Sequence, residues 1–206
     1  MPSNSIIAGV LLAGGQSRRM GGGDKCLREL GGQTLLTRII ERAAPQIGPM
    51  MLNANGDSSR FAAFGLPVFA DVVEGYAGPL AGVLTGLEWA ADHAPGCDWV
   101  ASFACDAPFL PLDLVTRLLA VIEDQNADLA CARSNGRDQP VFGVWPVRLA
   151  AELRRAVVDE DIRKVDVWTA RYNLAHADFD DSAIDPFFNV NRPEDFATAE
   201  TLLTGL

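Results

Sequence analysis

Short apolar runs alternate along the chain with longer segments of helical periodicity. Apolar runs of this kind predict buried strands at Ile6–Leu12, Met50–Asn53, Pro67–Ala70, Trp99–Ala104, Leu129–Ala132, Val141–Trp145, Leu174–Asp178 and Phe187–Val190. Helical periodicity predicts a turn at Ser59–Phe64 and helices at Leu35–Ala44, Leu80–Asp92, Leu112–Glu123, Val147–Val157, Ile162–Ala170 and Pro193–Leu203, the first capped by Thr34. This alternation predicts a single α/β domain over residues 1–206, with a mostly parallel, Rossmann-like sheet and helices on both faces.

The acidic balance of the chain excludes several classes of function. With 27 acidic and 17 basic residues, a net charge of -10, nonspecific nucleic-acid binding by a basic face is not expected. No apolar run approaches the roughly 20 residues of a membrane helix, so no membrane span is predicted. The four cysteines form no C-x-x-C pair, which predicts a cytoplasmic protein rather than a disulfide scaffold. With only two histidines, a histidine-rich metal site is not expected.

The loop after the first predicted strand combines glycines with positive charge. Ligands of parallel sheets bind beyond the carboxyl ends of the strands, which is where the loop from Leu12 to Lys25 lies. Glycines let backbone N–H groups approach an anion, and four cations gather here: Arg18, Arg19, Lys25 and Arg28. The pattern predicts a site for a small polyanion such as a triphosphate. It matches neither the P-loop, because Lys25 precedes Cys26, nor G-x-G-x-x-G.

Polar residues and glycines follow two further predicted strands. Asn53 ends the second strand and Asp71 follows the third. A carboxylate can accept both N1–H and N2–H of guanine, which cytosine and uracil do not offer together, so Asp71 is a candidate guanine reader. An ordinary turn role is the alternative for both residues. Gly78 and Gly82 open a predicted helix, where bare N–H groups attract polar edges or anions and small residues also permit close packing.

Four further residues are candidates for binding a metal or a second substrate. Asp106 leaves a buried strand, where an acid is well placed to hold Mg²⁺ between triphosphate oxygens, with turn or helix capping as the alternative. Arg137 precedes a predicted strand and is a candidate ligand of a second anionic substrate, or else a solvated hairpin arginine. Asn189 and Asn191 share one side of an extended segment, so both are expected to face the cleft and bind metal or phosphate; helix capping is the alternative for Asn191.

These segments together resemble a known family. The string Leu12-Ala13-Gly14-Gly15-x-Ser17-x-Arg19-Met20-Gly21-x-x-Asp24-Lys25 resembles the signature of nucleotidyltransferases that activate a phosphate or sugar phosphate with an NTP. Its Gly-Gly-x-Asp-Lys ending is similar to the molybdenum cofactor guanylyltransferases, whereas related cytidylyltransferases more often read Ala-Ala-Gly at the start. Gly-Pro-Leu-x-Gly, Asp106 and Asn-x-Asn-x-Pro-Glu-Asp follow in the family's order, so the resemblance runs from Leu11 to about Asp195.

The resemblance implies a fold of the nucleotide-diphospho-sugar transferase type and transfer of GMP from GTP to the terminal phosphate of molybdenum-molybdopterin, with release of pyrophosphate. By position it implies catalysis by Arg19, Lys25 and Asp106; GTP binding by Leu12, Ala13, Gly14, Gly15, Lys25, Asn53, Asp71, Gly78, Gly82 and Asp106; a Mg²⁺ cofactor on Asp106; and acceptor binding by Arg137, Asn189 and Asn191. Its candidate protein partners are the molybdenum insertion enzyme and molybdoenzyme chaperones.

Two alternatives to this function remain open at the level of sequence. One is another NTP transferase, using CTP with molybdopterin or an NTP with a sugar phosphate. The other is a catalytically silent nucleotide-sensing module. The presence of both Lys25 and Asp106 disfavours the silent module, because nucleotide binding alone does not require the metal-binding acid.

Overall fold

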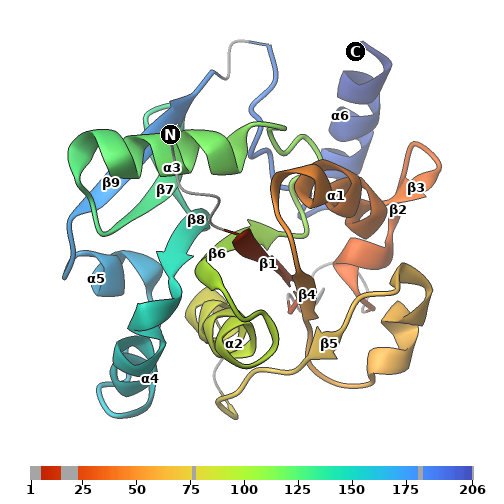
Figure 1. Ribbon diagram of the computed structural model, residues 1–206. Helices are drawn as coiled ribbons and strands as arrows, with labels where there is room; N and C mark the ends of the chain where they lie inside the picture. Colours follow the sequence, from red (N-terminus) through yellow and green to blue (C-terminus); the bar gives the residue numbers. More distant parts are fainter. Residues whose placement is uncertain (1–5, 15–22, 76–77, 181–182, 206) are drawn as a thin grey trace.

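The protein is built on a seven-stranded mixed sheet (Figure 1). The computed structural model describes residues 6–14, 23–75, 78–180 and 183–205. The strands are β1 (Ile6–Leu12), β4 (Met50–Asn53), β5 (Val68–Phe69), β6 (Cys97–Ala104), β7 (Leu129–Ser134), β8 (Arg137–Pro146) and β9 (Leu174–Phe179), in the order β5-β4-β1-β6-β8-β7-β9. Within this sheet β8 runs antiparallel to β6 and β7, and the other neighbours pair in parallel. The predicted α/β fold with a mostly parallel sheet is confirmed.

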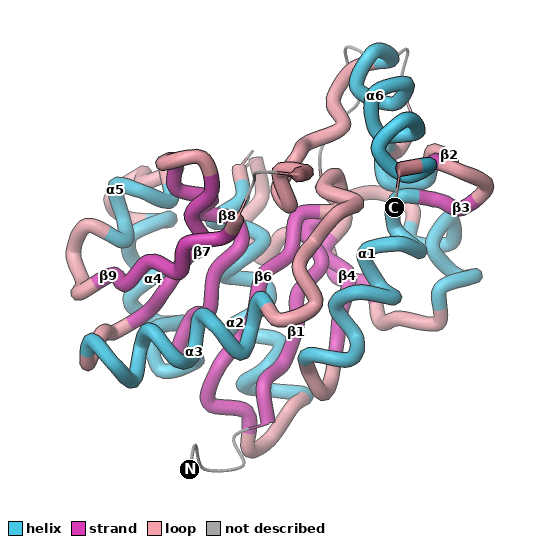
Figure 2. The backbone as a smooth tube through the Cα atoms, turned by 90° about the horizontal axis from the view of Figure 1, so that it is seen from above, coloured by secondary structure: helices cyan, strands magenta, loops and turns pink. Residues whose placement is uncertain are grey.

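Helices cover both faces of the sheet (Figures 1 and 2). On one face lie α1 (Leu35–Ala43) and α3 (Leu114–Gln125), and on the other α2 (Pro79–His93), α4 (Ala150–Val158) and α5 (Val165–Thr169). Each face has its own apolar core, represented by Leu36 and Leu118 on the first and by Leu84 and Trp168 on the second, all fully buried. Burial of two apolar faces fixes the sheet between helices, so its carboxyl edge is left for polar loops. Among the described helices, none is long and apolar enough to cross a membrane.

A small third unit packs beside the main sheet. The hairpin β2 (Glu29–Leu30) and β3 (Gln33–Thr34) turns at Gly31 and Gly32, whose φ angles of 57° and 80° suit a two-residue hairpin. It lies against α6 (Pro193–Thr204), as Figures 1 and 2 show. The unit has its own apolar cluster, which includes Leu30, Phe109, Val190 and Ala199. This hairpin was not predicted from the sequence, whereas α6 was.

Several predicted boundaries change in the structure. Thr34 caps α1 as expected, since its side chain accepts a hydrogen bond from the Thr37 N–H at 3.1 Å. The turn predicted at Ser59–Phe64 is a 3-10 helix, η4 (Ser58–Phe64). The helix predicted at Val147–Val157 begins as a 3-10 turn, η5 (Val147–Leu149), and continues as α4. Two further 3-10 turns are η2 (Lys25–Leu27) and η3 (Ala44–Gln46).

The strand predicted at Phe187–Val190 is wrong. Asp185 turns the chain instead, because its side chain accepts from the Phe187 N–H at 3.0 Å and its carbonyl accepts from the Phe188 N–H at 3.0 Å. Phe187 and Val190 are buried, but their backbone joins no sheet edge. The Val190 N–H donates to the Asp106 carbonyl at 2.9 Å, so this segment is tied to the loop after β6.

Candidate active site

The carboxyl ends of the central strands are joined to one another by backbone hydrogen bonds. The Ala13 N–H donates to the Asn53 carbonyl at 3.0 Å, and the Cys105 N–H to the Leu12 carbonyl at 3.3 Å. The Ala54 N–H donates to the Phe69 carbonyl at 3.0 Å. The exits of β5, β4, β1 and β6 therefore form one row, where ligands of parallel sheets bind.

Lys25, Asp106 and Asn191 form a contiguous polar cluster at this edge. The Lys25 Nζ lies 2.5 Å from Asp106 Oδ2 and 2.6 Å from Asn191 Oδ1, to both of which it donates. The Lys25 and Asp106 side chains are 15% and 23% exposed, so the ion pair is largely shielded from bulk water. The structure thus brings together three of the predicted site residues, contributed by η2, the loop after β6 and the segment before α6.

The second oxygen of Asp106 is a candidate metal ligand. Its Oδ1 is buried and has no hydrogen-bond partner among the residues that the structure describes, and a buried acceptor of this kind is costly unless something binds it. The described residues contain no group of three His, Cys, Asp or Glu side chains that could enclose a metal ion. A cation here would take one carboxylate from the protein and its other oxygens from phosphate and water, as Mg²⁺ does at nucleotide sites. The residues present therefore fit a hard divalent cation.

The start of α6 holds Asn191 in place. Asp195 Oδ2 accepts from the backbone N–H groups of Asn191 at 2.8 Å and Arg192 at 2.7 Å. Asn189 is exposed, and its side chain makes no hydrogen bond with any described residue. The alternation predicted for an extended chain does not apply here, because the segment is irregular rather than a strand. Capping is also not the role of Asn191, since Arg192 is the N-cap of α6.

Asp71 is held by two asparagines. Asn53 Nδ2 donates to Asp71 Oδ1 at 3.0 Å, and Asn55 Nδ2 donates to Asp71 Oδ2 at 2.8 Å. The Asp71 N–H in turn donates to Asn55 Oδ1 at 2.8 Å. Asn55 was missed in the sequence, although Asn53-Ala54-Asn55 has the same spacing as the Asn-x-Asn segment that was singled out. The structure brings Asn53 and Asp71 together as expected and adds Asn55.

Arg60 connects this asparagine cluster to the first loop. Its Nε lies 2.5 Å from Asp24 Oδ2, and its Nη2 donates to the Asn55 carbonyl at 2.5 Å. Arg60 lies in η4 and was also missed, because its position in the sequence gives no indication that it reaches Asp24. The Arg60 guanidinium therefore links Asp24, the residue before Lys25, to Asn55, which holds Asp71.

The two predicted glycines of α2 differ in their surroundings. Gly78 is the exposed N-cap of the helix. Gly82 is buried, and a Cβ atom there would lie 2.5 Å from both Asn53 Oδ1 and Leu12 Cδ2. Gly82 therefore lets α2 approach the ends of β1 and β4, and it supports Asn53 by packing.

Gly82→Ala and Gly86→Ala form a matched pair of variants. A Cβ at Gly86 would lie 2.8 Å from Val10 Cβ, away from Asn53, so both variants overpack the same helix. We expect each to lower the free energy of unfolding by roughly 1–3 kcal/mol, measured by urea denaturation. Only Gly82→Ala displaces Asn53, so only that variant should also weaken GTP binding in calorimetry. Equal loss of affinity in both variants would mean that general destabilisation, rather than Asn53, is responsible.

The remaining predicted residues occupy different environments. Gly15, Arg19 and Arg18 lie outside the described residues. Gly14 is exposed, and Leu12 and Ala13 form the exit of β1. Arg137 follows the two-residue turn Asn135–Gly136 and begins β8, so it lies at the same carboxyl edge as Asp106, but its side chain makes no hydrogen bond or ion pair with the described residues.

Two buried cysteines flank the cluster. Burial raises the pKa of Cys26 to about 12 and raises the pKa of Cys105 well above its ordinary value. A thiol nucleophile needs a depressed pKa, so neither residue is suited to covalent chemistry.

Thiol reactivity checks this assignment. All four cysteines are free and buried, so the native protein should react negligibly with Ellman's reagent at about pH 8, whereas the denatured protein should release four equivalents. The absorbance of the released thiolate, followed over time, would measure both. Fast modification of the native protein with loss of activity would contradict the buried, inert reading.

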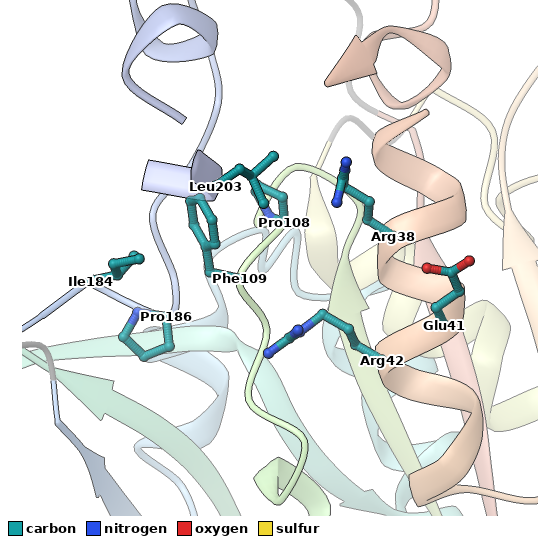
Figure 3. A pocket seen from close by; sticks show the side chains of 8 residues that line it. All are labelled: Arg38, Glu41, Arg42, Pro108, Phe109, Ile184, Pro186 and Leu203. Atoms are coloured by element: carbon teal, nitrogen blue, oxygen red, sulfur yellow. The ribbon is translucent and has the colours of Figure 1, made fainter. Parts of the chain in front are cut away.

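A cavity of about 200 Å³ lies elsewhere, between α1, the loop after Asp106 and α6 (Figure 3). It is lined by Arg38, Glu41, Arg42, Pro108, Phe109, Ile184, Pro186 and Leu203, which include none of the predicted site residues. Arg38 donates to the carbonyls of Leu30 and Gly31, and Arg42 to that of Leu110. These arginines tie the β2–β3 hairpin and the loop after Asp106 to α1.

Comparisons with known proteins show the family of the chain. The MobA-like NTP transferase domain matches residues 9–173. A molybdenum cofactor guanylyltransferase of Rhodopseudomonas palustris (strain BisB5) is 54% identical over 202 residues, which are 98% of this chain and 96% of the relative.

Two solved structures have the same fold. Molybdopterin-guanine dinucleotide biosynthesis protein A from Archaeoglobus fulgidus superposes with a TM-score of 0.75 at 22% identity, over 97% of this chain and 100% of that one. Rv0371C from Mycobacterium tuberculosis H37Rv, in complex with manganese, superposes with a TM-score of 0.68 at 20% identity, over 96% of this chain and 99% of that one.

Proposed function

This chain belongs to the family of molybdenum cofactor guanylyltransferases, and from that membership we propose that Lys25, Asp106 and Asn191 form the centre at which the family's reaction takes place. The protein is a nucleotidyltransferase that forms molybdopterin guanine dinucleotide. Its substrates are GTP and molybdenum-molybdopterin. The observation that carries the proposal is the Lys25 contact with both Asp106 and Asn191, at 2.5 and 2.6 Å, on the carboxyl edge of the sheet.

The reaction requires little proton transfer by the protein. An oxygen of the acceptor's terminal phosphate attacks the α-phosphorus of GTP, the new P–O bond forms, and the bond to the bridging oxygen breaks to release pyrophosphate. The attacking phosphate is already anionic near neutral pH, so no protein base has to act. Catalysis then depends on positioning the two anions in line and on neutralising their charge.

Lys25 supplies positive charge where the two phosphates meet. Its ammonium already lies between an acid and an amide oxygen, and in this position it can donate to phosphate oxygens of either substrate. We assign triphosphate binding to Lys25 and the backbone N–H of Gly14 at the exit of β1. Ala13 is proposed to border the nucleotide without donating to it, because its N–H already donates to the Asn53 carbonyl at 3.0 Å. We also assign triphosphate binding to Gly15 and Arg19, on the basis of the sequence motif alone.

Asp106 is proposed to hold Mg²⁺. Its unpartnered, buried Oδ1 supports this role, as does the manganese bound by a structure of the same fold. Such an ion, when bound, neutralises charge between phosphate oxygens. Asn191 Oδ1 lies 2.6 Å from the Lys25 Nζ, so it is proposed as a further oxygen ligand of this ion. The alternative is that the side-chain N–H of Asn191 donates to the acceptor phosphate.

The two substrates are assigned to different parts of the carboxyl edge. Guanine is proposed to lie at Asp71, Asn53 and the start of α2 at Gly78. Gly82 packs against the Asn53 side chain and supports it. The acceptor is proposed to lie toward Arg137, Asn189 and Asn191, where exposed polar side chains follow β7 and precede α6. Four free thiols support a cytoplasmic location. The molybdenum insertion enzyme and molybdoenzyme chaperones are proposed as protein partners, because the acceptor has to be delivered and the product passed on.

Release of pyrophosphate tests the proposal. With GTP and Mg²⁺, release should depend on added molybdenum-molybdopterin, and the product should carry one GMP per pterin. CTP in place of GTP should give little release. Equal release without the acceptor, or preference for CTP, would overturn the assignment of substrates.

A further inference from the structure

We infer that Asn55 is a positioning residue that fixes the carboxylate of Asp71 and thereby sets the base selectivity of the enzyme. The inference rests on the proposed role of Asp71 as the guanine reader. Asn55 follows β4 and is exposed at the carboxyl edge, so it belongs to the site without being part of the core.

The contact between Asn55 and Asp71 has two points. The Asp71 backbone N–H can only donate, and it donates to Asn55 Oδ1 at 2.8 Å. This bond orients the amide, so that its Nδ2 faces Asp71 Oδ2, also at 2.8 Å. A carboxylate held in this way cannot rotate about its own bond without losing a hydrogen bond.

The remaining acceptor positions of Asp71 match guanine. An ionised carboxylate has about four lone-pair sites, two on each oxygen. Asn53 occupies one site on Oδ1 and Asn55 occupies one on Oδ2, at 3.0 and 2.8 Å. No other donor among the described residues contacts these oxygens, which leaves one site on each, the number that the N1–H and N2–H of guanine require. Without Asn55, the Oδ2 side of the carboxylate would be free to turn or to bind water.

Asn55 can be tested separately from the packing of the site, whereas Asn53 cannot. Asn53 is 3% exposed, lies against Gly82 and also donates to the Phe69 carbonyl at 3.3 Å, so its removal disturbs the core. The other anchor of Asn55 is its backbone carbonyl, which accepts from Arg60 and is unchanged by substitution. Asn55→Ala therefore removes the two-point contact alone.

The experiment measures the affinities of GTP and inosine triphosphate, which lacks the 2-amino group, for four proteins. The wild type should prefer GTP by roughly 10- to 150-fold, the value of one hydrogen bond to a charged group. Asn55→Ala should reduce this preference by about 3- to 10-fold, and it should raise the KM for GTP by a larger factor than it lowers kcat. In the Asp71→Ala background, adding Asn55→Ala should change nothing further, because a positioning residue acts only through its target.

A second variant and a control make the result specific. Asn55→Asp keeps an oxygen for the Asp71 N–H but places a carboxylate against Asp71 Oδ2, so it should reduce the preference more than Asn55→Ala does. Asn173→Ala, an exposed asparagine that donates to the Asn126 carbonyl, should leave the preference intact.

Each outcome bears on one statement. An unchanged preference in Asn55→Ala, or an equal loss in the Asp71→Ala background, overturns the role of Asn55. A wild type that does not distinguish the two nucleotides, while still forming the dinucleotide product, overturns Asp71 as the reader and with it this inference. Failure to form the product at all would overturn the proposed centre instead.

Discussion

Replacing Asp106 with alanine is expected to lower kcat roughly a thousandfold, or about 4 kcal/mol of transition-state stabilisation. The change removes the proposed metal ligand and leaves the ammonium of Lys25 without its carboxylate partner. The backbone contact from Val190 to the Asp106 carbonyl is unaffected, so α6 should remain in place. Steady-state pyrophosphate release at saturating Mg²⁺ measures the loss, and thermal unfolding checks that the fold is retained.

Two further variants decide whether the charge of Asp106 is what matters. Asp106→Asn keeps the size of the side chain but should lower kcat nearly as much as Asp106→Ala, because a neutral amide holds Mg²⁺ poorly. Asp98→Ala removes an exposed acid from the opposite end of the same strand and should retain activity. Near-normal turnover of Asp106→Asn would exclude Asp106 from the metal site.

Lys25→Ala is expected to lower kcat roughly a hundredfold, or about 3 kcal/mol. The ammonium contacts both Asp106 and Asn191, so its loss removes positive charge from the place where the two phosphates are proposed to meet. The Mg²⁺ concentration that gives half-maximal activity should not rise, because the cation no longer competes with Lys25 for Asp106. That difference separates this variant from Asp106→Ala in a titration of Mg²⁺.

The chain supplies good controls for Lys25. Lys164, its other lysine, is exposed at the start of α5, and Lys164→Ala should have no effect. Arg28→Ala should lower kcat less than Lys25→Ala does, because Arg28 lies beyond the nucleotidyltransferase signature, which ends at Lys25. Recovery of activity in Lys25→Arg would indicate that charge alone suffices. Equal losses at Lys25 and Arg28 would show that the cationic loop acts as a diffuse field.

The layers of the fold could be predicted because buried strands and amphipathic helices have different apolar periods. The direction of β8 could not be predicted in this way, because an apolar run such as Val141–Trp145 does not indicate whether a strand runs parallel or antiparallel to its neighbours. The Asn135-Gly136 dipeptide did indicate the direction, because Asn-Gly favours a two-residue hairpin turn and so an antiparallel pair. Both residues have positive φ in the structure. The error at Phe187–Val190 has a similar cause, because an apolar segment can be buried by its side chains without its backbone pairing in a sheet.

The part of the candidate site that follows directly from the ends of strands could be predicted from the sequence. Lys25 and Asp106 follow strands or their loops, and topology alone brings them to one edge. Arg60 could not be found, because its partners Asp24 and Asn55 are chosen by the path of η4 rather than by a motif. Asn55 could have been found from its spacing to Asn53.

The bond between Lys25 and Asn191 also has a consequence for biosynthesis. The two residues are 166 positions apart, so at about 5–20 residues per second a ribosome makes Asn191 roughly 8–33 s after Lys25. The last strand of the sheet, β9, ends at Phe179, before Asn191 has been translated. A nascent chain, or one clipped ahead of Asn191, therefore contains every strand of the seven-stranded sheet but lacks the amide partner of its lysine. The contact between Lys25 and Asn191 can therefore form only after translation has passed Asn191, which lies just before the final helix.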